Sequence, residues 1–305
     1  MLYVPSQPYQ HTHQNPPNYK TPADRGLRYE DVEITTPDGV KLRGWFILQG
    51  NNNDESRKCD TYCYFHENAG NIGLRMDYFI LMNRLGYNLL IVAYRGYSES
   101  EGYPSEAGLK IDGVAIVNWL KNQGHLVDLN RCWFIGRSLG GAVGIHMLSE
   151  ITDFFQGALI ENTFTGISEM ADKLFPFLKA IPTIKKAMLK LNWNSGETIK
   201  KVKTPTLFIT GTADTFVPPE MIEQLHRDFT GPYKELMIVE GGGHNDTYMR
   251  AGDAYGEQMK IFMNKCIEMK GGKKQIRELP VKHYSEMEHG GQPEPENTQM
   301  HAKYE

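Results

Sequence analysis

Short apolar runs recur along the central part of the chain, and they alternate with segments in which apolar residues return every three or four positions. The runs have the length and composition of strands buried on both faces: TYCYFH (61–66), NLLIVAY (88–94), RCWFIG (131–136), GALIENT (157–163), PTLFIT (205–210) and ELMIVE (235–240). The alternating segments have helical spacing and cover residues 73–85, 106–123, 139–150, 218–229 and 253–269. This alternation predicts an α/β fold with a mostly parallel central sheet and helices on both faces.

The two ends of the chain differ in character from this central part. Residues 29–48 form a hairpin pattern with its turn at Asp38-Gly39, and the polar, proline-containing residues 1–26 precede it. Residues 271–305 are similarly polar, so neither end carries enough apolar surface to offset the entropy of ordering. We therefore expect a disordered or partner-bound tail over 1–26, one domain over 27–270 and a C-terminal tail over 271–305.

One insertion interrupts the alternation of strands and helices. Residues 166–200 form an amphipathic, proline-containing segment between two predicted strands. We interpret this segment as a small cap over a substrate cleft. The alternative is an additional surface helix with no part in the site.

Composition excludes several classes of partner and location. The net charge of −4 gives no basic surplus for nucleic acid, and no stretch approaches the roughly 18 apolar residues that a membrane-spanning helix needs. The chain has 4 cysteines, and Cys59 and Cys63 are spaced i, i+4, unlike a zinc or redox pair. We expect a cytoplasmic protein with reduced thiols, no cofactor and no metal site.

Three residues whose side chains can take part in catalysis each follow a predicted strand. Ser138 lies in the sequence Gly136-Arg137-Ser138-Leu139-Gly140, between a strand and a helix, which is the context of a nucleophile elbow. Asp214 follows the strand at 205–210, and His244 follows the strand at 235–240. Ligands of parallel sheets collect at the carboxyl ends of the strands, and the order Ser, Asp, His is that of α/β-hydrolases. The sequence therefore predicts a catalytic triad.

This triad needs donors for the oxyanion that forms during acyl transfer. One donor is the backbone N–H of Leu139, directly after the nucleophile. The second should come from the loop after the strand at 61–66, which reads HENAGNIG, so we assign it to Glu67 or Asn68. We expect His66 to position this loop, and Tyr97, Phe164 and Phe216 to line an apolar substrate pocket.

The combined motifs resemble a known family. HENAGNIG, AYRGYSESEG, FIGRSLGGAVGIHM, ENTFTGI, GTADTFVPP and GGGHNDT are similar to the bud-emergence-suppressor (Bem-type) branch of the α/β-hydrolases, which contains the thirteen-type abhydrolase-domain proteins. The resemblance spans about residues 30–265. It implies the α/β-hydrolase fold, a triad of Ser138, Asp214 and His244, and hydrolysis of acyl esters or thioesters.

The chain departs from this family at three places. Glu67 stands where relatives carry glycine, and glutamate strains the backbone if this position needs positive φ. Its carboxylate either opposes the oxyanion or points to solvent while the backbone amide still donates. Ala93 and Ser98 also differ from the usual residues of their loop. Many eukaryotic relatives begin with a membrane anchor, whereas this chain begins with a tail rich in Pro, Gln and His.

Other residues carry weaker hypotheses. Cys132 lies inside a strand, so we interpret it as a core thiol, and His11 and His13 in a polar tail do not make a metal site. The alternative to an enzyme is a structural component of a large assembly, such as a ciliary doublet microtubule, held by its tails. A hydrolase fold does not by itself require catalysis.

Overall fold

The fold is built around one sheet, and the computed structural model describes residues 3–174 and 193–271. Eight strands run in the order β1-β2-β4-β3-β5-β6-β7-β8. Their bounds are β1 Tyr29–Thr35, β2 Lys41–Ile47, β3 Thr61–Phe65, β4 Asn88–Val92, β5 Cys132–Arg137, β6 Ala158–Glu161, β7 Thr206–Gly211 and β8 Lys234–Val239. The pairs β1–β2 and β2–β4 are antiparallel, and the pairs from β4–β3 to β7–β8 are parallel.

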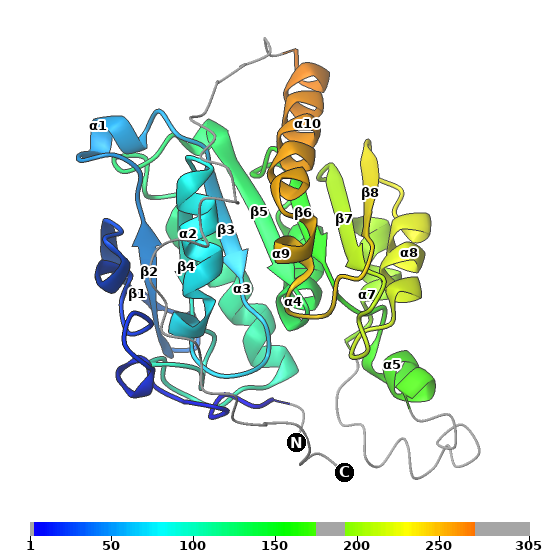
Figure 1. The fold of residues 1–305 in the computed structure, drawn as a ribbon, viewed down its shortest axis with the longest axis horizontal. Coiled ribbons are helices and arrows are strands. Elements are labelled where there is room, and N and C mark those ends of the chain that lie inside the picture. Colours follow the sequence, from blue (N-terminus) through cyan, green and yellow to red (C-terminus); the bar gives the residue numbers. More distant parts are fainter. Residues whose placement is uncertain (1–2, 175–192, 272–305) are drawn as a thin grey trace.

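Helices cover the sheet on both faces, as the sequence predicts (Figure 1). The longer ones are α2 Met76–Arg84, α3 Glu106–Leu120, α4 Leu139–Glu150, α8 Pro219–Asp228 and α10 Asp253–Met269. The hydroxyl of Tyr78 on α2 lies 3.1 Å from that of Tyr255 on α10, so these two helices share one face. Helices α3 and α4 contact each other on the opposite face.

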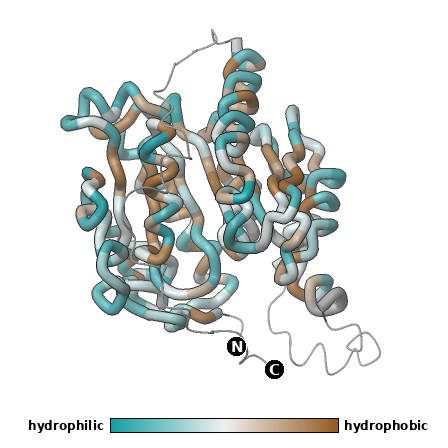
Figure 2. The backbone as a smooth tube through the Cα atoms, viewed as in Figure 1, coloured by the Kyte–Doolittle hydropathy of each residue, from teal (hydrophilic) through white to brown (hydrophobic). Residues whose placement is uncertain are grey.

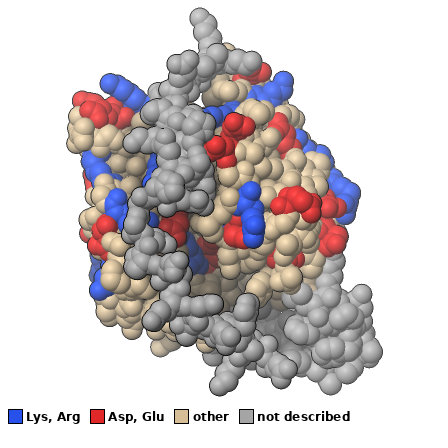
Figure 3. Space-filling model, in the orientation of Figure 1, with Lys and Arg blue, Asp and Glu red and all other residues tan. Residues whose placement is uncertain are grey.

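Burial follows the apolar pattern of the strands. Every residue of β3, β4 and β5 is buried, whereas β8 at the edge is mostly half-buried. Figure 2 shows the corresponding concentration of hydrophobic residues on the central strands. On the surface visible in Figure 3, basic and acidic side chains are interspersed, and they form no single basic patch there. The order of the strands and the helices on both faces of the sheet confirm the predicted α/β-hydrolase fold.

The shorter elements connect these layers. They are the helices α1 Asn53–Ser56, α5 Ile167–Leu174, α7 Ser195–Thr198 and α9 Thr247–Ala251, and the 3₁₀ turns η1 Thr12–Gln14, η2 Pro22–Arg25, η3 Ile72–Arg75, η4 Leu129–Arg131 and η6 Ile199–Lys201. The predicted cap over 166–200 contains α5 and α7 and ends within η6, but residues 175–192 lie outside the described residues. Residues 272–305 of the predicted C-terminal tail also lie outside them. The cap, the tail and the domain boundaries stay predictions.

The N-terminal residues differ from the expected disordered or partner-bound tail, because residues 3–26 lie against the domain itself. Val4 forms a parallel bridge with Ala69. Asn15 is buried, and its side chain exchanges two hydrogen bonds with that of Asn71, at 2.7 and 2.6 Å. These anchors are mostly polar, which explains why a count of apolar residues does not reveal them.

Candidate active site

Ser138 occupies a strained turn between β5 and α4. Its backbone has φ +51° and ψ −120°, a region that residues other than glycine rarely adopt. The flanking glycines are required by close approach, since a Cβ at Gly136 would lie 2.6 Å from the carbonyl oxygen of Gly140, and one at Gly140 would lie 2.0 Å from that of Phe65. The local sequence therefore folds as a nucleophile elbow.

The structure brings Ser138, His244 and Asp214 together at the carboxyl end of the sheet. The Ser138 hydroxyl lies 3.0 Å from Nε2 of His244 and is placed to donate to it. Nδ1–H of His244 donates to Oδ2 of Asp214 at 2.7 Å. The other carboxylate oxygen accepts the backbone N–H groups of Phe216 and Val217, at 2.9 and 2.8 Å. This arrangement fixes the carboxylate and leaves the lone pair of Nε2 directed at the serine.

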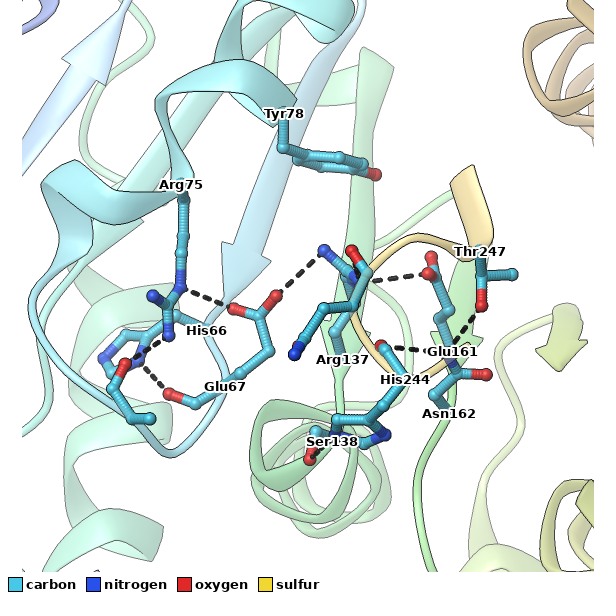
Figure 4. Close-up of polar contacts among 12 residues, drawn as sticks. His66, Glu67, Arg75, Tyr78, Arg137, Ser138, Glu161, Asn162, His244 and Thr247 are labelled. Carbon is cyan, nitrogen blue, oxygen red and sulfur yellow. Dashed lines mark hydrogen bonds and ion pairs between the residues drawn. The ribbon is translucent and has the colours of Figure 1, made fainter. Parts of the chain in front are cut away.

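Asn162, directly after β6, holds the loop that carries His244. Its side-chain N–H₂ donates to the carbonyl oxygen of His244 at 3.1 Å and to Oγ1 of Thr247 at 2.8 Å (Figure 4). Its Oδ1 accepts the backbone N–H of Gly211 at the end of β7. Asn162 has φ +46°, so the backbone carries strain in order to aim this amide. Sequence reasoning missed this residue.

The side chain of Glu67 does not point to solvent, which was one of the two alternatives derived from the sequence. Its carboxylate is buried and lies between two guanidinium groups, 2.8 Å from Nε of Arg75 and 2.8 Å from Nη1 of Arg137 (Figure 4). The backbone of Glu67 does not have a positive φ, so the position does not require glycine for its conformation. Burial would raise the pKa of this carboxyl, but Arg75 and Arg137 outweigh burial and lower the pKa to about 2.

Arg137 connects this carboxylate to a second one. Nε of Arg137 lies 3.1 Å from Oε1 of Glu161, and the guanidinium packs over the rings of Tyr78 and Tyr248. Burial disfavours its charged form, yet the two carboxylates hold the pKa of Arg137 above its ordinary value. Burial raises the pKa of Glu161 in spite of this contact. Sequence reasoning missed Arg75, Arg137 and Glu161, although Arg137 lies inside the elbow motif.

The predicted oxyanion residues surround Ser138. Leu139 is the first residue of α4, so its N–H makes no hydrogen bond within the helix. Glu67 and Asn68 line the same cavity as Ser138. Nδ1 of the buried His66 lies 2.7 Å from the carbonyl oxygen of Glu67, and its Nε2 accepts the N–H of Tyr94. Burial, with Arg75 nearby, lowers the pKa of His66 to about 4, so this imidazole is neutral at pH 7.

A cavity of about 460 Å³ lies beside Ser138 and His244. The predicted pocket residues Phe164 and Phe216 line it, and the ring centroid of Phe216 lies 5.5 Å from that of His244. Tyr97 does not line this cavity, which differs from the expectation. Its side chain is fully buried, and its hydroxyl donates to Oδ1 of Asn68 at 2.6 Å, so Tyr97 supports the loop from behind.

Ser98 is one of the positions at which the chain departs from the family it resembles, and the structure explains this residue by a local contact. Ser98 has φ +50°, where glycine would be unstrained. Its hydroxyl oxygen accepts the backbone N–H of Ile72 at 3.0 Å, a contact that glycine could not make. The loop after β4 is thereby tied to the loop after β3.

The weaker candidates lie elsewhere. Cys132 is buried at the start of β5, and the rings of His11 and His13 stack on each other. Within residues 3–174 and 193–271, no group of three or more His, Cys, Asp or Glu side chains is placed to hold a metal ion. The helices of that part of the chain include none that is long and apolar enough to cross a membrane.

The chain is similar to hydrolases over most of its length. Residues 78–270 match the prolyl oligopeptidase family. Over 256 residues the chain is 36% identical to the alpha/beta hydrolase domain-containing protein WAV2 of Arabidopsis thaliana, covering 80% of this chain and 82% of that protein. It is 35% identical over 248 residues to protein bem46 of Schizosaccharomyces pombe, covering 81% and 80%. The solved structure of an esterase from Pyrococcus furiosus superposes with a TM-score of 0.63 at 25% identity, over 80% of this chain and 95% of that one.

Proposed function

The chain belongs to the prolyl oligopeptidase family, in the branch of the α/β-hydrolases that contains protein bem46, and from this membership we propose that it is a serine hydrolase of acyl esters or thioesters. The observation that carries the proposal is the hydrogen-bonded chain from the Ser138 hydroxyl through His244 to Asp214, at 3.0 and 2.7 Å. Ser138 and His244 line a cavity that can hold a substrate.

The first half of the reaction forms an acyl-enzyme. Oγ of Ser138 attacks the carbonyl carbon while Nε2 of His244 takes the hydroxyl proton. Asp214 keeps its own charge and stabilises the imidazolium that results. The tetrahedral intermediate then collapses, the bond to the leaving alcohol or thiol breaks, and His244 gives the leaving group its proton.

The second half releases the acid. Water attacks the acyl-enzyme as His244 takes one of its protons, and the new intermediate expels Ser138, which regains a proton from His244. In both halves of the reaction the oxyanion accepts hydrogen bonds from the backbone N–H of Leu139 and from that of Glu67 or Asn68. Each such donor is worth about 2.7–4 kcal/mol of barrier.

The Glu67 carboxylate is compatible with this role. A bare carboxylate beside a developing oxyanion would oppose it. Here Arg75 and Arg137 both contact the carboxylate at 2.8 Å and compensate its charge. Glu67 can therefore contribute its backbone amide to an oxyanion hole without presenting an uncompensated negative charge.

Ester hydrolysis by purified variants tests the proposal. We expect wild-type protein to hydrolyse p-nitrophenyl butyrate and Ser138→Ala to lose about 10³-fold or more in kcat. Ser149→Ala is the matched control, because Ser149 lies in α4, the helix that follows Ser138, and its hydroxyl donates to the carbonyl oxygen of His146. A wild-type rate no higher than that of Ser138→Ala would contradict the proposal. The scaffold role, with its ciliary location, stays a prediction that such a result would favour.

A further inference from the structure

The N-terminal segment, residues 3–8, lies against the loop that follows β3. Val4 forms a parallel bridge with Ala69, and its carbonyl oxygen accepts the N–H of Gly70 at 3.2 Å. The N–H of Val4 donates to Oδ1 of Asn68 at 3.3 Å. Gly70 has φ +67°, and a Cβ there would lie 2.9 Å from the carbonyl oxygen of Gln7, so the two backbones are in close contact.

This segment also forms part of the cavity that contains Ser138. Tyr3, Val4 and Pro8 line the cavity together with Ser138 and His244. Figure 1 shows the N-terminal end of the chain crossing the edge of the sheet at which the parallel strands end. The segment is therefore a wall of the candidate active site as well as a covering of the domain surface.

Tyr3 is the most enclosed side chain of this wall. It is 7% exposed, and its hydroxyl accepts Nε1–H of Trp193 at 3.2 Å. Burial raises the pKa of Tyr3 to about 12, so its phenol stays neutral. The cavity is also lined by the apolar side chains of Ile167 and Met170, which gives the space beside Tyr3 the character of an acyl pocket.

Packing on the domain does not by itself explain these contacts. Tyr19 also packs on the domain, and its hydroxyl donates to Asp77 at 2.9 Å, but Tyr19 does not line the cavity. The two tyrosines thus provide a comparison within one N-terminal region. A role confined to folding would affect both variants alike, whereas a role in the pocket would affect Tyr3 alone.

We propose that residues 3–8 complete the acyl pocket and that the Tyr3 ring limits the length of acyl chain that the enzyme accepts. The inference rests on the proposed hydrolase function and adds a specificity determinant to it. Removing the ring opens space in the cavity. Each further methylene that this space accommodates favours the longer substrate by about fourfold.

The test compares acyl-chain selectivity in four full-length proteins: wild type, Tyr3→Ala, Tyr3→Phe and Tyr19→Ala. The readout is the ratio of kcat/KM for p-nitrophenyl octanoate to that for p-nitrophenyl acetate. We expect this ratio to rise about tenfold or more in Tyr3→Ala, which corresponds to about two methylenes. It should stay within about twofold of wild type in Tyr3→Phe and Tyr19→Ala, because the first keeps the ring and the second lies outside the cavity.

A ratio unchanged in folded Tyr3→Ala, or raised equally in Tyr19→Ala, would overturn the inference while leaving the hydrolase proposal intact. Circular dichroism and thermal unfolding establish that each variant is folded. If Tyr3→Ala does not fold, Val4→Ala replaces it, with an expected rise of about fourfold for the smaller volume removed and an unchanged ratio as the contradicting result. Absence of ester hydrolysis in wild-type protein would instead reject the proposed function, and the inference with it.

Discussion

Oε1 of Glu67 lies 2.8 Å from Nη1 of Arg137, the residue that directly precedes the candidate nucleophile Ser138. This contact joins the loop after β3 to the end of β5, and both residues line the cavity. The parallel register that pairs Phe65 with Gly136 brings the two ends together. The Glu67 carboxylate is therefore a compensated, structural charge.

Replacing Glu67 by Gln should destabilise the fold. The substitution leaves Arg75 without its 2.8 Å carboxylate contact and Arg137 with only Glu161. Removing one partner of a buried ion pair typically costs about 3–5 kcal/mol, and urea unfolding measures this loss. Glu33→Gln, which breaks the exposed pair with Arg43, should cost less than about 1 kcal/mol. A stable Glu67→Gln that hydrolyses esters about tenfold faster would mean that the carboxylate opposes the oxyanion.

Asn162 should affect the rate more than substrate binding. Without its amide, the His244 loop loses the hydrogen bonds to the carbonyl oxygen of His244 and to Thr247. Misplacing a catalytic group by about 1 Å can cost on the order of 100-fold. We expect Asn162→Gly, which also relieves the strain at φ +46°, to lower kcat about 10- to 100-fold with KM within about twofold. Wild-type kcat in Asn162→Gly would show that the side chain does not position His244.

Asp214→Asn should nearly abolish turnover. An amide in this position directs N–H₂ at Nδ1 of His244, which favours the tautomer with the proton on Nε2, where the base must be free. The expected loss in kcat is about 10⁴-fold, measured with p-nitrophenyl butyrate. Because Oδ1 still accepts the N–H groups of Phe216 and Val217, thermal unfolding should change little. A loss in kcat below tenfold would show that Asp214 does not take part in the reaction.

His66 should make stability depend on pH. Its pKa is lowered to about 4 in the folded protein, against an ordinary value of 6.5. The unfolded chain therefore binds the proton first, and stability is lost as pH falls from about 6.5 to about 4. The full effect is on the order of 3 kcal/mol. Urea unfolding at pH 7.5 and 4.5 should show a smaller pH difference for His66→Gln than for wild type. Equal differences would contradict the assignment.

The sequence is sufficient to predict the sheet, the helices and the placement of three site residues. Ser138, Asp214 and His244 each follow an apolar run, so the geometry of parallel sheets gathers them at one edge. Their meeting depends on the fold class alone, which the alternation of apolar runs and helical segments determines.

The supporting contacts depend on details that a single sequence does not contain. Glu67 meets Arg137 through the register of β3 and β5, and Asn162 meets the His244 loop through a strained backbone at the end of β6. Residues 3–26 are held by Tyr3, which is buried, and by hydrogen bonds between the side chains of Asn15 and Asn71, which leave no apolar periodicity. The position of Tyr97 in a loop predicts a place in the pocket, but its burial behind Asn68 depends on the turn of that loop.

Covalent labelling is the most direct measurement of whether Ser138 is an activated nucleophile. Purified wild-type protein is treated with a fluorophosphonate probe, and the modified residue is mapped by peptide mass spectrometry. The account predicts modification at Ser138, no labelling of Ser138→Ala and strongly reduced labelling of His244→Ala, because the imidazole activates the hydroxyl. An unlabelled wild-type protein, or a probe attached to a different serine, would contradict it.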